Sequence, residues 1–257
     1  IEYSHQLAQK VAKKLNIPIF MYEMSATSKD RQNLAIIRKG EYEGMSEKLK
    51  LKKWKPDYGP DKLNIKSGVM AIGVSEFLIA YNINLNTSDK KIASDIALDI
   101  REAGRAKRDK DGKIIRDNDG VMVKVPGSLK HVKAVGWFLD EYNVAQVSMN
   151  LINYKETPVH KVFEEVRSQA QKRGLRVTGS ELVGLIPLDS LINAGKYYLK
   201  QQNKSYGVSD SQLIHIAVKS MGLDEMYEFK SNEKIIDYMI NDSEKLINKT
   251  ISNFADE

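Results

Sequence analysis

Hydrophobic positions at the start of the chain change from a helical to a strand pattern. "IEYSHQLAQKVAKKLN" has the helical period, with Leu7, Val11 and Leu15 on one face, and Pro18 prevents the helix from continuing. "IPIFMYEMSA" then predicts a buried strand. A shorter helix is predicted over residues 30–39, between an aspartate and a glycine, and the lysine-rich segment after it is expected to be a loop.

Strand and helix patterns alternate from Gly68 onward. "GVMAIGV" and "EFLIAYNINLN" predict two strands, and "SDKKIASDIALDIREAG" predicts a helix with Ser88 as N-cap and Gly104 as its stop. "HVKAVGWFLDEYN" and "VAQVSMNLIN" predict adjacent strands, "TPVHKVFEEVRSQAQKRG" a helix and "LRVTGSELVGLIPL" a strand. From Phe77 to Leu188 the order is therefore that of a ferredoxin-like βαββαβ sheet, in which helices cover one face of an antiparallel sheet.

Two remaining regions complete the predicted fold. Residues 105–128 are polar and contain an Asn-Asp-Gly turn between β-branched runs, which predicts a small surface hairpin. The segments after Leu188 are helical by period, and no internal repeat is expected. We expect an α+β fold with two α/β sheet units, the second a ferredoxin-like βαββαβ sheet, followed by C-terminal helices.

The amino-acid composition excludes some classes of protein and of functional site. The 257 residues include 40 basic and 34 acidic side chains, a modest positive excess that favours an anionic ligand without requiring nucleic acid. No apolar run approaches the roughly 20 residues of a membrane-spanning helix. The absence of cysteine excludes disulfides, thiolate zinc sites and thiol nucleophiles, and it agrees with a reducing compartment. We expect a cytoplasmic protein that does not bind membranes.

Common catalytic motifs are absent from the sequence. The histidines are too far apart for a metal-ligand spacing, so no metal is expected, and neither a glycine-rich phosphate loop nor a GxSxG elbow is present. His160 lies on the first turn of its predicted helix between Val159 and Val162. A lone histidine in this position is more often structural than a proton carrier.

Two rows of polar residues interrupt apolar strands. Asn82 and Asn84 form one row, and Gln146, Ser148 and Asn150 form the other, each with the strand period of two. Each row therefore lines one face of the sheet, where amides cost free energy unless they bond a partner or a ligand. A ligand-binding face and a solvated face both fit this pattern.

Several longer segments resemble one family. "EYEGMSEKLKLKKWKPDYGP", "FLIAYNINLNT", "IREAGR", "VKAVGWFLDEYNVAQVSMNL" and "GSELVGLIPLDSL" are similar to the glutamate formiminotransferase (glutamate formimidoyltransferase) family, and the resemblance leaves out only residues 109–127. It implies an enzyme of histidine degradation that moves the formimino group of N-formimino-L-glutamate to N5 of tetrahydrofolate, giving 5-formiminotetrahydrofolate and glutamate. It also implies two α/β subdomains with the folate co-substrate between them.

The resemblance assigns binding roles. It implies that the loop from Trp54 to Gly68 lines the folate site, while the lysines at 48–53 attract the glutamate tail. The residues implied there are Trp54, Asp57, Tyr58, Gly59, Pro60, Asp61, Lys62, Leu63, Asn64, Ile65, Lys66, Ser67 and Gly68. Arg101 and Arg105 are expected on one face of a helix end, pairing with a substrate carboxylate or, alternatively, solvated there. The substrate-cleft candidates are Asn82, Asn84, Arg101, Arg105, Gln146, Ser148 and Asn150.

The sequence also departs from the family pattern. The family's catalytic histidine lies in a "HKGEHPRMG"-like motif expected before Ile1, so this chain alone is expected to have no turnover, with His160 as a weak stand-in. "ISNFADE" resembles the opening of a cyclodeaminase domain, so we expect a fragment of a bifunctional enzyme. The expected domains are the rest of the N-terminal subdomain at 1–77, the C-terminal subdomain at 78–205, and a helical linker at 206–257.

A different class of protein remains open. Sheets of βαββαβ order with basic surfaces also occur in RNA-binding proteins, so a non-catalytic anion- or RNA-binding module is the alternative. The central strands lack the aromatic pattern that stacks bases. We therefore expect tetrahydrofolate or its polyglutamate and N-formimino-L-glutamate as partners and no nucleic acid, with homo-oligomerisation left open.

Overall fold

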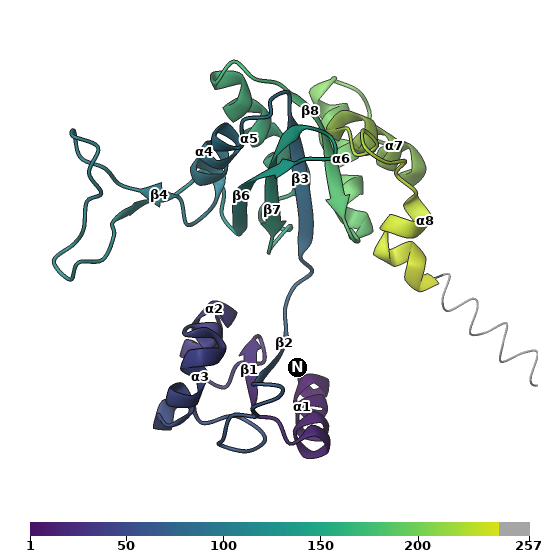
Figure 1. Ribbon diagram of the computed structural model, residues 1–257. Helices are drawn as coiled ribbons and strands as arrows, with labels where there is room; N and C mark the ends of the chain where they lie inside the picture. Colours follow the sequence, from purple (N-terminus) through teal and green to yellow (C-terminus); the bar gives the residue numbers. More distant parts are fainter. Residues whose placement is uncertain (242–257) are drawn as a thin grey trace, which may run out of the picture. The chain divides into compact units, whose positions relative to one another are not determined.

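The computed structural model describes residues 1–241 and divides the chain into two compact units. The first is Ile1–Glu76, and the second begins at Phe77 (Figure 1). No helix in the described part is long and apolar enough to cross a membrane. "ISNFADE" and the end of the expected linker lie outside the described residues.

The first unit is built on two parallel strands with helices on both faces. Its elements are α1 (Glu2–Leu15), β1 (Ile19–Glu23), the 3₁₀ turn η1 (Lys29–Arg31), α2 (Leu34–Arg38), α3 (Glu41–Leu49), the 3₁₀ turn η2 (Lys52–Trp54) and β2 (Met70–Val74). β1 pairs with β2 from Ile19 opposite Met70 to Glu23 opposite Val74. Because successive strand side chains point to opposite faces, Ile19 and Met21 pack with α1, whereas Phe20 packs with the residues of α2, α3 and η2.

The packing of this unit corrects three expectations. Leu7 and Leu15 of α1 are half exposed, and the helix instead buries Ser4, Ala8 and Ala12, whose small side chains let it approach β1 closely. The predicted helix over 30–39 is divided into η1 and α2, with Asn33 capping α2. The lysine-rich segment is mostly helical, in α3 and η2, rather than a loop.

The second unit contains the predicted ferredoxin-like sheet. Its elements are β3 (Ile79–Leu85), α4 (Lys90–Ile100), β4 (Arg105–Ala106), β5 (Lys124–Val125), β6 (Val132–Leu139), β7 (Val144–Leu151), α5 (Val159–Lys172), β8 (Val177–Val183), α6 (Leu188–Gln201), α7 (Asp210–Met221) and α8 (Ser231–Lys234). The main sheet has the order β6-β7-β3-β8 with every pair antiparallel, which confirms the predicted α+β class.

One face of this sheet carries the core. Tyr81 and Ile83 of β3, Val147 of β7 and Leu182 of β8 are buried on it. The helices α4 and α5 cover this face (Figure 1). α6 and α7 extend the same core. The opposite face, which we call the open face, carries no helix of the second unit within the described residues, although the segment after α7 reaches one end of it through Glu225. The sheet thus has one structural face and one face able to receive a ligand.

The helix α4 ends earlier than predicted. Its N-cap is Asp89 rather than Ser88, and its last residue is Ile100 rather than a residue next to Gly104. Arg101 is the C-cap with an extended backbone, and Arg105 lies in β4. The two arginines therefore do not share a helix face, which corrects that expectation.

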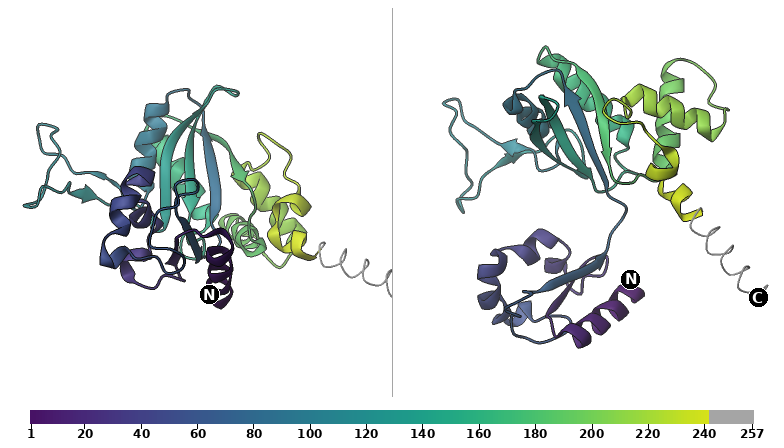
Figure 2. Two further views of the ribbon diagram at one scale, coloured as in Figure 1. Left: turned by 60° about the horizontal axis from the view of Figure 1, so that its bottom comes forward. Right: turned by 45° about the vertical axis from the view of Figure 1, so that its right-hand side comes forward.

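An arm formed by residues 105–126 projects away from the sheet in both views of Figure 2. It is more than the single predicted hairpin: "RDKDGKI" and "RDNDGVM" start eight residues apart and form two similar turns. Asp109 accepts hydrogen bonds from the backbone of Asp111 and Lys113, and Asp117 repeats this pattern one turn later. The expectation of no internal repeat is therefore wrong at this short scale.

The two hairpins and the β4–β5 stem of the arm meet in a ring of backbone hydrogen bonds. Lys107 donates to Val123 (2.8 Å), Val123 to Ile115 (3.0 Å) and Ile115 to Lys107 (2.9 Å). The side chains of Ile115 and Val123 are only partly buried, and nearly all the rest of the arm is exposed. Backbone bonding rather than a hydrophobic core gives the arm its form.

Candidate functional site

The open face is a grid of three cross-strand rows. Strand register places side chains side by side across β6, β7, β3 and β8. The rows are Trp137, Gln146, Asn84 and Gly179; then Val135, Ser148, Asn82 and Glu181; then Lys133, Asn150, Ala80 and Val183. The predicted polar rows therefore do share one face, and they stand directly opposite each other.

The first row is already hydrogen bonded within the protein. The Nε2 of Gln146 donates to Oδ1 of Asn84 (2.7 Å), and Nδ2 of Asn84 donates to Oε2 of Glu225 (2.6 Å). Asn84 and Gln146 are only 2% and 1% exposed. Neither amide is solvated, and each bonds a protein partner, as a buried amide must where no ligand is present. A role of this row towards substrate stays a prediction.

The other two rows are more open. Asn82 donates to Glu181 (3.1 Å), which is the only acid of the grid. Ser148 is partly buried and Asn150 is exposed, and within residues 1–241 neither side chain forms a hydrogen bond. These two side chains can therefore bond a ligand without first breaking a protein contact.

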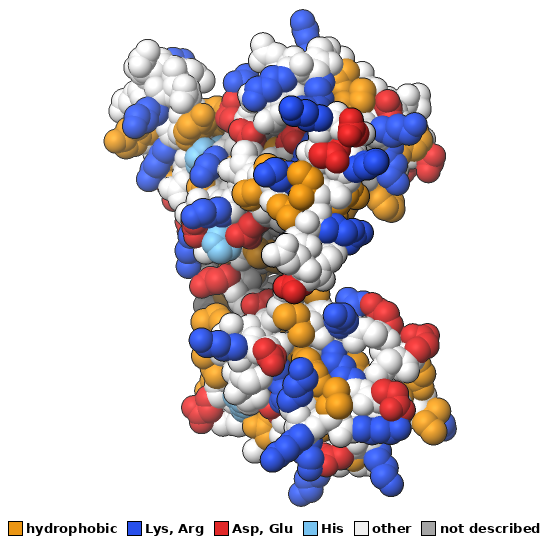
Figure 3. Space-filling view, turned by 90° about the vertical axis from the view of Figure 1, so that its left-hand side faces the viewer, with side chains coloured by type: hydrophobic (Ala, Val, Ile, Leu, Met, Phe, Trp, Pro, Cys, Tyr) orange, Lys and Arg blue, Asp and Glu red, His pale blue; other side chains and the backbone are white. Residues whose placement is uncertain are grey.

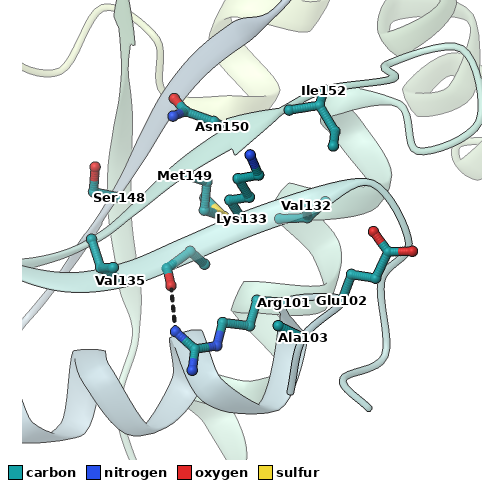
Figure 4. Close-up of a pocket in the computed structure, with 11 residues that line it drawn as sticks. Arg101, Glu102, Ala103, Val132, Lys133, Val135, Ser148, Met149, Asn150 and Ile152 are labelled. Carbon is teal, nitrogen blue, oxygen red and sulfur yellow. Dashed lines mark hydrogen bonds between the residues drawn. The ribbon is translucent and has the colours of Figure 1, made fainter. Parts of the chain in front are cut away.

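A hollow of about 520 Å³ lies at the β6 end of these rows (Figure 4). Its walls come from β6, β7 and the loop after α4, and the residues that matter most here are Arg101, Lys133, Val135, Ser148 and Asn150. The structure thus brings together three of the predicted cleft residues, Arg101, Ser148 and Asn150. The sequence analysis missed Lys133, although its position opposite Asn150 follows from strand period and pairing.

Arg101 is held by backbone carbonyls and not by a carboxylate. Its Nε donates to the carbonyl of Gly104 (3.0 Å), and its NH1 lies 3.5 Å from the carbonyl of Ala134, the bond drawn in Figure 4. No described carboxylate forms an ion pair with Arg101 or Lys133. The hollow is also lined by one acid, Glu102, whose Oε2 accepts from the backbone of His131 (3.1 Å). Two cations without carboxylate partners, beside Ser148, Asn150 and apolar Val135, suit an anionic ligand with a short carbon chain.

Arg105 is placed differently. Its guanidinium contacts Asp95 (2.9 Å) and Asp99 (2.5 Å), and Arg173 of α5 contacts the same two carboxylates. Burial alone would raise the pKa of Asp95, but hydrogen bonds from Arg173 and Arg105 outweigh it and lower that pKa. Arg105 therefore anchors the arm to the helices, and its role towards substrate stays a prediction.

The first residues of the predicted folate loop are buried and bonded within the first unit. Trp54 is 6% exposed and meets Phe20 edge to face at 6.1 Å. Asp57 forms a buried ion pair with Arg31 (2.6 Å) and accepts from the backbone of Met21 (2.8 Å). Arg31 also donates to the carbonyls of Lys53 and Lys55. Sequence reasoning missed Arg31, because nothing in its local pattern points to a partner 26 residues away.

The middle of the loop is fixed by backbone geometry. Gly59 has φ +86°, and a Cβ there would lie 2.2 Å from the carbonyl oxygen of Ile17. Tyr58 bonds His5 through its hydroxyl (2.9 Å), and Lys55 pairs with Asp61 at the surface. The loop therefore has a defined shape before any ligand arrives.

The end of the loop is the part that is open to a ligand. Asn64 Oδ1 accepts from the backbone of Lys66 and Ser67, which leaves Ile65 84% exposed at the tip of the turn. Leu63, Ser67 and Gly68 line a small hollow of about 190 Å³ together with Arg38, Tyr42 and Met45. Pro60 and Lys62 lie between these parts and line neither hollow.

Lys48 was expected to be an exposed lysine that attracts the glutamate tail, but it is bonded within the protein. Its Nζ donates to the carbonyls of Ile36 and Ile37 (both 2.6 Å) at the end of α2, and it lies 4.1 Å from the ring centre of Trp54. Burial, with Lys39 and Lys53 nearby, lowers its pKa. Lys48 therefore caps a helix and covers an aromatic ring.

His160 is a poor proton acceptor at neutral pH. It stacks on Tyr197 at 4.5 Å in the helical layer, its Nδ1 has no described hydrogen-bond partner, and burial lowers its pKa to about 4. Its role as a stand-in stays a prediction. Nowhere in residues 1–241 are three histidine, aspartate or glutamate side chains grouped as metal ligands.

Comparison with known sequences gives a consistent result over both units. Residues 80–241 match the family described as Formiminotransferase domain, and residues 1–75 match Formiminotransferase domain, N-terminal subdomain. The formimidoyltransferase-cyclodeaminase of Dictyostelium discoideum is 42% identical over 96% of this chain and 42% of its own length. That of Sus scrofa is 38% identical over 100% and 45%.

A shorter relative covers most of the same region. The glutamate formimidoyltransferase of Streptococcus pyogenes serotype M1 is 39% identical over 80% of this chain and 62% of its own length. The chain thus spans less than half the length of the two cyclodeaminase relatives. The division between the two matched regions falls where the structure divides its units.

Proposed function

The chain belongs to the formiminotransferase family, and on this premise we propose that it binds the substrates of a glutamate formimidoyltransferase. In the proposed reaction N5 of tetrahydrofolate attacks the formimino carbon of N-formimino-L-glutamate. The new N5–C bond forms and N5 loses its proton, while the bond from that carbon to the glutamate nitrogen breaks and the leaving nitrogen gains a proton. The products are 5-formiminotetrahydrofolate and glutamate.

The observation that carries the proposal is the hollow at the β6 end of the open face. N-formimino-L-glutamate has two carboxylates, and Arg101 and Lys133 present two cations without carboxylate partners in the described residues. A carboxylate removed from water needs such donors, because an unpaired charge is expensive to bury. Ser148 and Asn150 line the same hollow and can supply further hydrogen bonds.

Tetrahydrofolate is the proposed co-substrate. Its pterin ring is flat and has several N–H donors and acceptors, for which Asn82, Asn150 and Glu181 of the open face are suitable partners. In the first unit, Leu63, Ser67 and Gly68 are the loop residues that line a hollow, so they are the best supported part of the proposed folate loop. The remaining loop residues support the shape of that segment.

RNA binding is less well supported. Of the grid positions on the open face, only Trp137 is aromatic. RNA-binding sheets of this order use several aromatic side chains to stack two or three bases. Oligomeric state and a cytoplasmic location stay predictions.

The proposal is tested by titrating the chain with N-formimino-L-glutamate and with tetrahydrofolate. Arg101→Ala is expected to weaken N-formimino-L-glutamate binding about tenfold, the effect of losing a hydrogen-bonded ion pair. Arg167→Ala is the matched control, because Arg167 is exposed on α5 and pairs only with Glu164 among described acids. Equal affinity of both variants and the unchanged chain would disprove the site, and tight RNA binding in its place would favour the alternative.

A further inference from the structure

The one acid of the hollow at the β6 end of the open face has no cation partner. Glu102 lies in the turn after α4, next to Arg101 in sequence, and Lys133 lines the same hollow from β6. Within residues 1–241 no ion pair joins Glu102 to either cation or to another basic side chain. The hollow therefore contains two positive charges and one negative charge that do not neutralise one another.

Two backbone bonds fix the position of Glu102. Its amide donates to the carbonyl of Val132 (3.0 Å), and its Oε2 accepts from the amide of His131 (3.1 Å). His131 has φ +56°, a left-handed conformation that residues other than glycine seldom adopt and that costs free energy. The other carboxylate oxygen of Glu102, Oε1, bonds no described group. A strained backbone thus holds a carboxylate that still has one oxygen to offer.

The three charged groups stay separate. In Figure 4 the charged ends of Glu102, Arg101 and Lys133 lie apart, and no dashed line joins them. Figure 3 looks onto the side from which the arm projects and shows basic and acidic side chains mixed over the second unit. A mixed surface gives no strong field of one sign, so recognition of a charged ligand depends on pairing inside the hollow.

N-formimino-L-glutamate carries the complementary set of charges. Besides its two carboxylates it has a formimino group, which is an amidine, a carbon bonded to two nitrogens. Amidines are strong bases that are protonated at neutral pH, so the group is a planar cation that shares its charge between two nitrogens, as a guanidinium does. A carboxylate can bind such a group through two parallel hydrogen bonds.

We propose that Glu102 binds the protonated formimino group of N-formimino-L-glutamate, an inference that rests on the proposed function. Oε1 is free for one N–H, and Oε2 can accept a second bond besides that from His131, because a carboxylate oxygen has two lone pairs. Arg101 and Lys133 then pair with the two substrate carboxylates. Glu102 is thus the residue that distinguishes a formimino group from a formyl group, which has a similar shape but no charge.

The test compares two ligands that differ only in this group. N-formimino-L-glutamate and N-formyl-L-glutamate are titrated calorimetrically into the unchanged chain. The formimino ligand is expected to bind roughly tenfold more tightly, the effect of one charge-assisted contact. The difference should shrink as salt is added, because Glu102 is exposed before the ligand binds. Equal affinity of the two ligands would overturn the inference.

A conservative variant removes only the charge. Glu102→Gln keeps the size of the side chain and an acceptor for the amide of His131. It should weaken binding of the formimino ligand about tenfold and leave binding of the formyl ligand unchanged. Glu156→Gln is the matched control, because Glu156 pairs with the side chain of the same histidine (2.8 Å) and does not line the hollow. Equal losses from both variants would show a diffuse charge effect and contradict the inference.

A second pair of variants tests how Glu102 is held. His131→Gly tolerates a positive φ and keeps the N–H that Glu102 accepts, so it should keep the preference for the formimino ligand. His131→Val disfavours this conformation, because its side chain is β-branched, and should reduce the preference. Circular dichroism checks that both variants fold. The same preference in both would contradict the positioning of Glu102 by this backbone.

The outcomes separate this inference from the proposed function. If neither ligand binds the unchanged chain, the proposed function is wrong and the inference falls with it. If both ligands bind and both are weakened by Arg101→Ala, but neither is affected by Glu102→Gln, the anionic site stands and the role of Glu102 is wrong.

Discussion

The loop at residues 54–68 and the open face of the sheet were both expected to bind ligand, yet they are built in opposite ways. The loop takes its form from buried contacts, such as the Arg31–Asp57 pair and the left-handed Gly59, and only its last residues line a hollow. The open face takes its form from strand register and leaves Ser148 and Asn150 without protein partners in the described residues. A segment whose sequence is characteristic of a family can therefore serve mainly to stabilise the fold. The side chains that are free to hydrogen bond a ligand can lie in another part of the molecule.

The largest expected loss of stability comes from removing the buried ion pair that holds the loop. Arg31→Ala should destabilise the first unit by about 4 kcal/mol, because it leaves Asp57 buried without its partner. Arg38→Ala, at an exposed pair with Glu41, should cost less than about 0.5 kcal/mol.

Each unit contains one tryptophan, so fluorescence can follow them separately. With Trp137 replaced by phenylalanine, urea unfolding reports on Trp54 and hence on the first unit. Similar small losses from Arg31→Ala and Arg38→Ala would show that the loop does not depend on the buried pair.

The next effect compares two glycines in the same loop. Gly59 and Gly68 both have positive φ, but a Cβ at Gly59 would strike the backbone of Ile17, whereas one at Gly68 would meet only the ring of Tyr42 at 3.4 Å. Gly68→Ala should cost about 1 kcal/mol, and Gly59→Ala should cost about 2 to 3 kcal/mol because a clash is added. The same urea titration measures both, and equal costs would mean that backbone conformation alone matters.

The third effect separates stability from binding on the open face. Asn84→Ala should lower the free energy of unfolding of the second unit by about 1 to 2 kcal/mol, since Gln146 and Glu225 lose a buried partner. Asn150→Ala, at an exposed position, should leave stability within about 0.5 kcal/mol. We expect the reverse order for N-formimino-L-glutamate affinity, and the proposed site is wrong if Asn150→Ala binds as tightly as the unchanged chain.

The last prediction concerns pH. Burial lowers the pKa of His160 to about 4 in the folded chain, against an ordinary value of 6.5. Below the ordinary value the unfolded chain binds a proton that the folded chain does not, so stability is lost as pH falls from about 6.5 towards 4. In urea unfolding at pH 7 and pH 4.5, His160→Phe should weaken this dependence, and His215→Phe, on the exposed side of α7, should retain it. An unchanged slope in His160→Phe would contradict the burial argument.

Much of the fold follows from local pattern. The period-two runs at 79–85 and 144–151 identify strands and the face that each side chain takes, because alternation of faces is a property of the strand itself. The predicted cleft residues Ser148 and Asn150 came from that rule. Lys133 could have been added from the same rule applied to the neighbouring strand.

Several of the errors share one cause, which is contact between distant residues. Ala8 and Ala12 are the buried face of α1 because β1 lies close to it, and a pattern of large apolar side chains cannot show this. Lys48 was assumed to be free, but it reaches the carbonyls at the end of α2, and Arg31 reaches across 26 residues to Asp57. Charge along the sequence does not reveal which cations are already paired.

The hydrogen-bonded ring of Lys107, Ile115 and Val123 also makes the arm a convenient graft point for protein engineering. Each hairpin leaves the ring and returns to it within one eight-residue period. The exposed tip at residues 117–121 can therefore be exchanged for an epitope or a fluorophore-binding tag while the ring keeps the other hairpin in register.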